Sequence, residues 1–227
     1  MKTAIVTGSS GNMGKAIVQE LLNKGYRVIG TVMPNEVNPV DHNHFVRKEL
    51  NLLDEQEVAA FINEAIAAYN SIDVAVLTVG GFASGAIADT RTADIMRQVE
   101  LNFSTTYTMA RPVLLQMKQQ GFGRIFMTGS RPGLHAMYGS GMIAYSLGKS
   151  LLFRLADLMN EEVKGKNIVT SIVVPSTIDT PQNRKAMPDA DPSNWVKPSE
   201  IAGIISYHCS DEATALRETV IKVYGNS

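Results

Sequence analysis

The chain has 227 residues, of which 44% are hydrophobic and 19% are charged, and its formal net charge is −1. This composition is typical of one soluble globular domain; the nearly neutral charge gives no support to nucleic-acid binding, and no uncharged apolar run approaches the roughly 20 residues of a membrane span. The single cysteine, Cys209, excludes an internal disulfide and fits a reducing, cytoplasmic compartment.

Short apolar runs alternate with longer helical patterns along the chain. Strands are predicted at 4–6, 27–32, 45–46, 74–77, 124–127, 168–174 and 220–223. Helices are predicted at 15–23, 55–69, 92–119, around 145–149 and at 199–209. The first residues lead directly into a strand, so no signal peptide is expected. Strict alternation predicts an α/β fold, with residues 1–227 as a single Rossmann-type domain whose doubly wound parallel sheet carries helices on both faces.

A glycine-rich turn follows the first predicted strand and opens the first predicted helix. Glycine lets the backbone turn sharply and approach a phosphate, while a helix N-terminus offers free N–H groups. The turn is therefore predicted to bind a dinucleotide pyrophosphate through Gly8, Ser10, Gly11, Asn12, Met13 and Gly14. A Walker-type loop is excluded because Ala16 follows Lys15 and leaves no hydroxyl for magnesium. A plain connecting turn and a methyltransferase turn remain alternatives for this motif alone.

Tyr145 and Lys149 are four residues apart, and therefore share one face of a predicted helix. A free tyrosine has a pKa near about 10. An ammonium about 4 Å away would stabilise the phenolate by roughly 4 kcal/mol and bring the pKa near about 7, where a general acid or base works well. On the pair alone, a tyrosine packed on the core beside a solvated lysine is the simpler interpretation. The preceding glycine turn favours redox chemistry.

The glycine turn and the segments 145–149, 174–180 and 197–202, in this order, resemble the short-chain dehydrogenase/reductase family along nearly the whole chain. The resemblance implies an NAD(P)-dependent oxidoreductase that transfers hydride between the nicotinamide and a carbonyl or alcohol substrate. It assigns the proton donor to Tyr145, and to Lys149 the lowering of its pKa and a contact with the ribose. It also implies that Ser130 holds the carbonyl oxygen and that Asn102 anchors a water in a proton relay.

The chain departs from the family pattern at several positions. Ser130 lies farther from Tyr145 than is usual, so the segment 131–141 is expected to contain a small insertion, with Ser140 as the second candidate. The three glycines have Gly-x-x-G-x-x-G spacing, which is the pattern of the larger branch of the family. The residues 77–80 replace the family's usual motif after the fourth strand and keep only its glycine, Gly80. After the sixth strand, Ser176 stands where the family usually has a glycine.

The resemblance also predicts cofactor contacts at the strand ends beyond the glycine turn. These are Val32, Asn51, Leu52, Gly80, Tyr145, Lys149, Pro175, Ile178 and Thr180. An acidic residue at the end of the second strand would bind the ribose 2′-hydroxyl of NAD. Residues 31–34 supply none, and Glu36 lies beyond a proline. No basic partner for a 2′-phosphate is obvious either, and the balance favours NADP slightly over NAD.

Three loops leave alternatives open for the substrate. The segments 80–85, 141–145 and 177–191, with Trp195, resemble dihydropteridine reductases, so reduction of a pterin is a second candidate activity. Ser130 favours an ordinary carbonyl or alcohol. A non-catalytic, NADP-binding regulatory protein is a third candidate, although the intact Tyr–Lys pair argues against it.

Assembly and metal binding have weaker signals. The resemblance implies a homodimer or homotetramer formed through two long helices. His42 and His44 lie in a polar loop without further ligands, so no metal site is expected.

Overall fold

The computed structural model describes residues 1–36 and 40–226. Seven strands form one parallel sheet in the order β3-β2-β1-β4-β5-β6-β7. Their bounds are β1 Thr3–Thr7, β2 Arg27–Val32, β3 Phe45–Glu49, β4 Val74–Leu77, β5 Phe122–Thr128, β6 Asn167–Pro175 and β7 Val220–Val223. The strand order reverses between β1 and β4, and a crevice outside the carboxyl ends at such a point is where open α/β sheets bind ligands.

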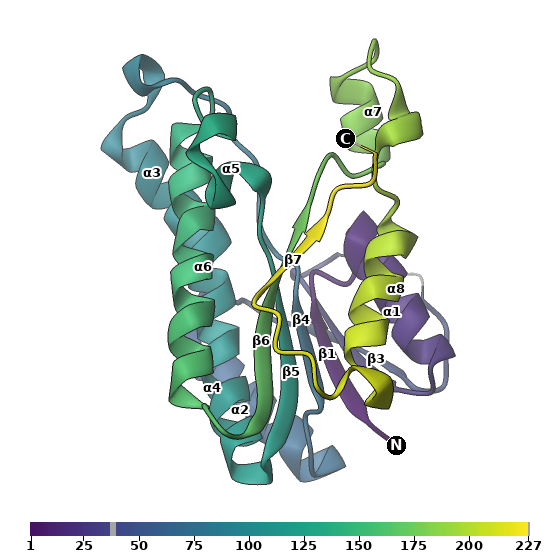
Figure 1. Ribbon diagram of the computed structural model, residues 1–227. Coiled ribbons are helices and arrows are strands. Elements are labelled where there is room, and N and C mark those ends of the chain that lie inside the picture. Colours follow the sequence, from purple (N-terminus) through teal and green to yellow (C-terminus); the bar gives the residue numbers. More distant parts are fainter. Residues whose placement is uncertain (37–39, 227) are drawn as a thin grey trace.

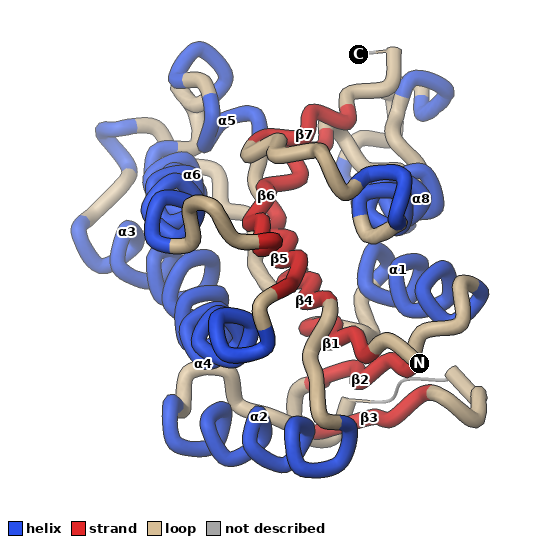
Figure 2. Tube along the Cα trace, turned by 60° about the horizontal axis from the view of Figure 1, so that its bottom comes forward, coloured by secondary structure: helices blue, strands red, loops and turns tan. Residues whose placement is uncertain are grey.

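Helices cover both faces of this sheet (Figures 1 and 2). Helices α1 (Asn12–Asn23) and α8 (Pro198–His208) pack on one face. Helices α2 (Glu55–Tyr69), α4 (Thr105–Gln120) and α6 (Ile143–Glu162) pack on the other. The predicted doubly wound α/β fold of Rossmann type is therefore confirmed.

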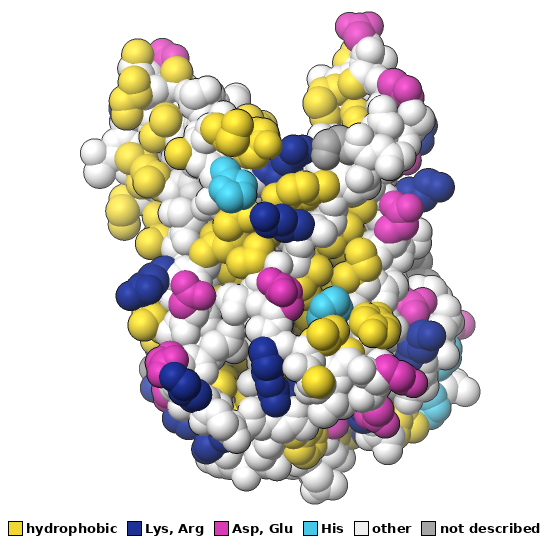
Figure 3. Space-filling model, in the orientation of Figure 1, with side chains coloured by type: hydrophobic (Ala, Val, Ile, Leu, Met, Phe, Trp, Pro, Cys, Tyr) yellow, Lys and Arg dark blue, Asp and Glu magenta, His cyan; other side chains and the backbone are white. Residues whose placement is uncertain are grey.

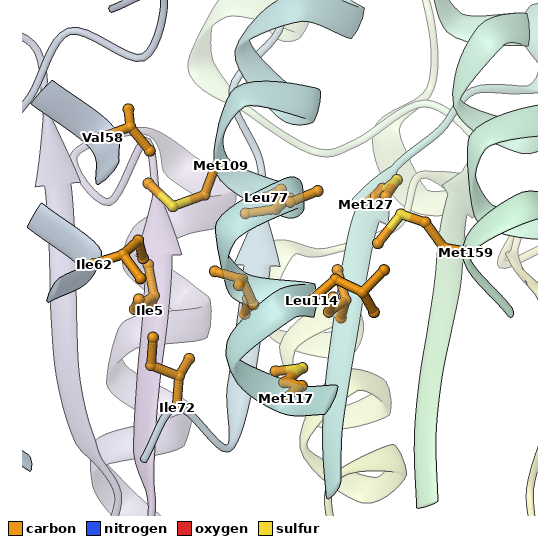
Figure 4. Close-up of a cluster of buried hydrophobic side chains, with 14 of the residues drawn as sticks. Ile5, Val58, Ile62, Ile72, Leu77, Met109, Leu114, Met117, Met127 and Met159 are labelled. Atoms are coloured by element: carbon orange, nitrogen blue, oxygen red, sulfur yellow. The ribbon is translucent and has the colours of Figure 1, made fainter. Parts of the chain in front are cut away.

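The two hydrophobic cores follow from the alternation of side chains along each strand. In β1, Ile5 belongs to the core beneath α2, α4 and α6, while Ala4 and Val6 belong to the core beneath α1 and α8. Helix α2 contributes Val58 and Ile62 to the first core (Figure 4). Both faces of β1 are fully buried, as the apolar composition of a central parallel strand predicts.

The region 92–119 differs from the single long helix that the sequence predicts. Helix α3 (Thr92–Val99) leads into a π-helical segment, Glu100–Ser104, before α4 begins. The hydroxyls of Thr105 and Thr106 donate hydrogen bonds to carbonyls four residues earlier, at 2.8 and 3.1 Å. Such side-chain bonds compete for carbonyls with the regular helical ladder. The π-helical segment contains Asn102, whose side chain is hydrogen-bonded to Gly81, beyond the carboxyl end of β4.

Short helices stand above the carboxyl ends of the strands. They are α5 (Arg131–Leu134), within the segment 131–141, and α7 (Pro181–Ala186), which stands on the opposite side of the molecule in Figure 1. Ser130 caps α5, because its Oγ accepts a hydrogen bond from Gly133 N at 3.1 Å. Among the described helices, none combines the length and apolar character that crossing a membrane requires.

Candidate active site

A cavity of about 590 Å³ opens at the carboxyl ends of β1, β2 and β4, where the strand order reverses. Figure 3 shows the molecule hollowed at this end between its two upper projections. Of the predicted cofactor residues, the cavity is lined by Gly8, Ser10, Gly11, Asn12, Met13, Gly14, Val32, Asn51, Leu52, Gly80 and Thr180. Residues from distant parts of the chain thus meet in one place, as the sequence predicts.

The glycine turn has a backbone that side chains would obstruct. Gly8 has a φ of +65°, a left-handed conformation that favours glycine. Gly11 N donates to Gly8 O at 3.0 Å, and α1 begins directly afterwards at Asn12. A Cβ on Gly14 would collide with the Gly8 carbonyl and lie 2.9 Å from Ser9 Cα. The turn therefore brings the first amides of α1 to the cavity wall, a suitable cradle for a pyrophosphate.

Glu36 lines this cavity, although it lies beyond a proline in the sequence. Asn35 has a φ of +65°, so the chain reverses after β2. Glu36 N donates to Met33 O at 3.1 Å, and Glu36 Oε2 accepts from Met33 N at 3.3 Å. The carboxylate is thereby returned to the end of β2.

Tyr145 lies on the first turn of α6 and is hydrogen-bonded to the side chain of Ser130. Burial raises the pKa of Tyr145 above its ordinary value, and the hydrogen bond from Ser130 lowers it by a smaller amount. The pKa of Tyr145 is therefore raised, whereas the sequence predicts that Lys149 lowers it to about 7. The neutral phenol is favoured because burial disfavours the charged form more than Ser130 stabilises it.

Lys149 lies one turn after Tyr145, and its side chain is buried within the protein. Lys149 Nζ donates to Thr128 O, at the end of β5, at 2.7 Å. Burial lowers the pKa of Lys149 from 10.5 to about 8, because a charged ammonium is disfavoured away from water. A lysine with this pKa can exchange a proton close to neutral pH.

The pKa of Lys149 gives a testable dependence of stability on pH. Between about pH 8 and pH 10.5, Lys149 binds more protons in the unfolded chain than in the folded one. The stability attributable to Lys149 therefore rises with pH in this window. At about 1.36 kcal/mol per pKa unit, the unfolding free energy of the wild type relative to Lys149→Met should rise by roughly 3 kcal/mol across this window. Urea titrations of both proteins at several pH values measure it. A difference that is constant with pH would contradict the burial of a charged group.

Asn102 is completely buried beside the same group of residues. Its Oδ1 accepts from Gly81 N at 3.1 Å, and its Nδ2 donates to Gly81 O at 3.0 Å. A Cβ on Gly80 would lie 2.5 Å from Asn102 Oδ1 and 3.0 Å from Lys149 Nζ. The turn after β4 therefore connects the cavity with Asn102 and Lys149, and a side chain at position 80 would displace one or both of them.

Other predicted site residues lie outside the cavity wall. Pro175 ends β6, and Ile178 forms an isolated bridge with Val196. Ser140 is the second candidate for the catalytic serine. Among the described residues, the serine hydrogen-bonded to Tyr145 is Ser130 and not Ser140. His42 and His44 have rings 5.6 Å apart, and no cluster of three metal-ligating side chains occurs within residues 1–36 and 40–226.

Several lining residues were not anticipated. They are Thr31, Met33, Glu36, Leu50, Leu53, Thr78, Val79, Arg97, Glu100, Leu101 and Thr105. Thr78 and Val79 directly follow β4, so the rule that ligands bind at strand carboxyl ends could have found them. Phe82 belongs to the segment 80–85. Its ring centroid is 5.2 Å from that of Tyr145, in an edge-to-face arrangement, although 66% of Phe82 is exposed.

The fold and this site together define a class of protein. A family model described as short chain dehydrogenase matches residues 2–191. The chain therefore belongs to the short-chain dehydrogenase/reductase family.

Individual relatives have different names. An acetoacetyl-CoA reductase of Acinetobacter sp. (strain RA3849) is 27% identical, over 99% of this chain and 96% of its own length. A dihydropteridine reductase of Dictyostelium discoideum is 28% identical, over 88% of this chain and 84% of its own length. A solved oxidoreductase of the same family from Burkholderia thailandensis is 26% identical with a TM-score of 0.84, and the match covers 99% of this chain and 91% of that one.

Proposed function

We propose that this protein is an NAD(P)-dependent reductase of small carbonyl compounds, also able to oxidise the corresponding alcohols. The observation that carries the proposal is the group formed by Ser130, Tyr145 and Lys149 beside the glycine-lined cavity. The phenol is hydrogen-bonded to Ser130, and Lys149 Nζ lies close to Gly80, which lines the cavity. Similarity to an acetoacetyl-CoA reductase supports a reductase rather than a protein that only binds the nucleotide.

The residues divide the chemistry among them. When bound, the nicotinamide cofactor supplies or accepts the hydride. The amides at the start of α1 and the turn at Gly8 would hold its pyrophosphate. Ser130 would hold the substrate oxygen, and the neutral phenol of Tyr145 would donate the proton to that oxygen. Lys149, whose pKa is about 8, would restore the proton near neutral pH, with Asn102 holding the adjoining turn.

A second candidate activity, reduction of a quinonoid dihydropterin, has one observation in its favour. The exposed ring of Phe82 stands against Tyr145, where a planar substrate ring could contact it. A panel of ketones, aldehydes and quinonoid dihydropterin, tested with NADH and NADPH, separates the candidates. Turnover of carbonyls supports the first, turnover of the pterin alone supports the second, and cofactor binding without any turnover supports a regulatory protein.

We propose NAD as the preferred cofactor, in place of the slight preference for NADP that the sequence indicates. The support is Glu36, whose carboxylate lines the cavity near Val32 and Met33. A carboxylate accepts hydrogen bonds from the ribose 2′-hydroxyl of NAD and repels the 2′-phosphate of NADP. The other charged side chains of the lining are Glu100 and Arg97.

Substitution Glu36→Gln should therefore shift the preference toward NADPH. The amide keeps an acceptor for Met33 N but removes the negative charge. We expect the ratio of the NADPH and NADH dissociation constants to fall about tenfold, equivalent to about 1.4 kcal/mol. Fluorescence titration with each cofactor measures the ratio. The control is Glu64→Gln on α2, which removes an exposed carboxylate paired with Lys48 and should leave the ratio unchanged. An unaltered ratio in Glu36→Gln would argue against the NAD proposal.

The same proposal includes a homodimer or homotetramer formed through α4 and α6. Large apolar side chains are exposed along both helices, namely Tyr107, Leu115, Leu147, Leu151 and Leu158. Burial of such a surface against a second copy would remove it from water, and sedimentation would give the corresponding mass.

We also propose that residues 1–227 act as one domain, and that the cytoplasm is its compartment, in keeping with the unpaired Cys209.

A further inference from the structure

Gln98 lies near the end of α3, one helical turn before Asn102. Its side chain is polar yet buried, with 5% of the residue exposed. Gln98 Oε1 accepts a hydrogen bond from Asn102 Nδ2 at 2.9 Å, and the Gln98 backbone oxygen accepts from the same nitrogen at 3.2 Å. A buried amide at this position needs a partner, and Asn102 provides it.

The Asn102 amide is shared between Gln98 and Gly81. Its NH₂ group has two hydrogens, of which one can point to Gly81 O and the other to Gln98. Its Oδ1 then faces Gly81 N. Without the acceptor on Gln98, one of these hydrogens would keep only the longer contact with the Gln98 backbone oxygen, and the amide would lose a restraint on its rotation.

The backbone of Gln98 is also fixed against the helix that carries Tyr145 and Lys149. A Cβ on Gly148 would lie 2.7 Å from Gln98 O. Helices α3 and α6 therefore approach closely at this point. Gln98 is thus held by α6 on one side and holds Asn102 on the other.

We propose that Gln98 is a positioning residue for the reaction. It holds the Asn102 amide, the amide holds the turn at Gly80 and Gly81, and this turn lies against Lys149 Nζ. Gln98 touches neither the cavity lining nor Tyr145 through any described hydrogen bond, so its effect passes through Asn102. The kinetic part of this proposal rests on the proposed function, whereas its structural part can be measured without turnover.

The structural test is hydrogen exchange at the Gly81 amide, followed by NMR in the full chain. Gln98→Met keeps the length of the side chain and removes the acceptor. We expect exchange at the Gly81 N–H to become about tenfold faster or more, because the Asn102 side chain that accepts its hydrogen bond is released. Gln98→Glu retains a carboxyl oxygen as acceptor and should keep exchange close to that of the wild type.

A matched control exists on α4, where Gln116 Nε2 donates to Gln120 Oε1 at 3.2 Å. This amide pair also spans four residues but is remote from Asn102. Gln116→Met should leave exchange at Gly81 unchanged. Unchanged exchange in Gln98→Met as well, with the fold intact by circular dichroism, would overturn the proposal.

The kinetic test is a double-mutant cycle with Asn102→Ala. We expect Gln98→Met to lower kcat about tenfold with less than about a twofold change in KM, and the double variant to be no slower than Asn102→Ala alone. Losses that multiply would show that Gln98 acts elsewhere and would overturn the proposal. If the wild type reduces no carbonyl while Gly81 exchange responds as expected, the proposed function fails and the positioning of Asn102 by Gln98 is supported.

Discussion

Replacing Tyr145 with phenylalanine is expected to lower kcat for carbonyl reduction by about 10³-fold, because the proposed proton donor is removed. The ring that packs against Phe82 remains, so the surrounding structure should change little. The dissociation constant of the cofactor should stay within about threefold of the wild-type value, since the glycine turn is untouched. Loss of NADH absorbance with the best substrate of the panel measures kcat, and fluorescence titration measures the cofactor affinity.

A suitable control is Tyr207→Phe, which makes the same change at an exposed position on α8. It should keep full activity. If Tyr145→Phe also retained more than about a tenth of the wild-type kcat, the phenol could not be the main proton donor.

Gly14→Ala is expected to abolish measurable cofactor binding, weakening it by at least about 100-fold, or about 2.7 kcal/mol. The added methyl group would collide with the Gly8 carbonyl and would lie 2.9 Å from Ser9 Cα. These are backbone atoms, so relief requires movement of the turn itself. Movement there displaces the amides at the start of α1 from the positions that a pyrophosphate needs. Calorimetric titration with NADH and NADPH measures the loss.

Two other glycines provide the comparison. A Cβ on Gly11 would have its nearest contact at 3.3 Å, and one on Gly203, in α8, would meet nothing within 4 Å. Gly11→Ala should therefore weaken binding less than Gly14→Ala. Gly203→Ala should leave binding unchanged and stabilise the fold by up to about 1 kcal/mol, because alanine favours a helix. Equal affinities in Gly14→Ala and Gly203→Ala would contradict the proposed phosphate site.

The sheet and the cavity at the strand ends could be predicted because their signals are local and repetitive. Successive side chains around Ile5 alternate between the two cores, and the glycines at 8, 11 and 14 directly follow that strand. The helix predicted at 55–69 is α2, which contributes Val58 and Ile62 to the core. These patterns depend on the chain's own geometry, and the order of strands in a parallel sheet then brings the ends together.

The parts that differed from expectation depend on contacts between distant residues. Glu36 is returned to β2 by a left-handed Asn35, which nothing in the hydrophobic pattern indicates. The break in the helix at Glu100–Ser104 accompanies a side-chain network that includes Gly81, about 20 residues away in the sequence. The pKa of Tyr145 depends on its burial, which raises it by more than the hydrogen bond from Ser130 lowers it.

The capping of α5 by Ser130 occupies one lone pair of the serine oxygen and leaves its hydroxyl hydrogen for another acceptor. Because the oxygen accepts from Gly133 N, the single hydroxyl hydrogen remains for the phenol oxygen of Tyr145 or, in the proposed reaction, for a substrate oxygen. The start of α5 therefore anchors Ser130 through an acceptor site of its oxygen. In the proposed reaction, the donor hydrogen of the same hydroxyl serves the reacting oxygen.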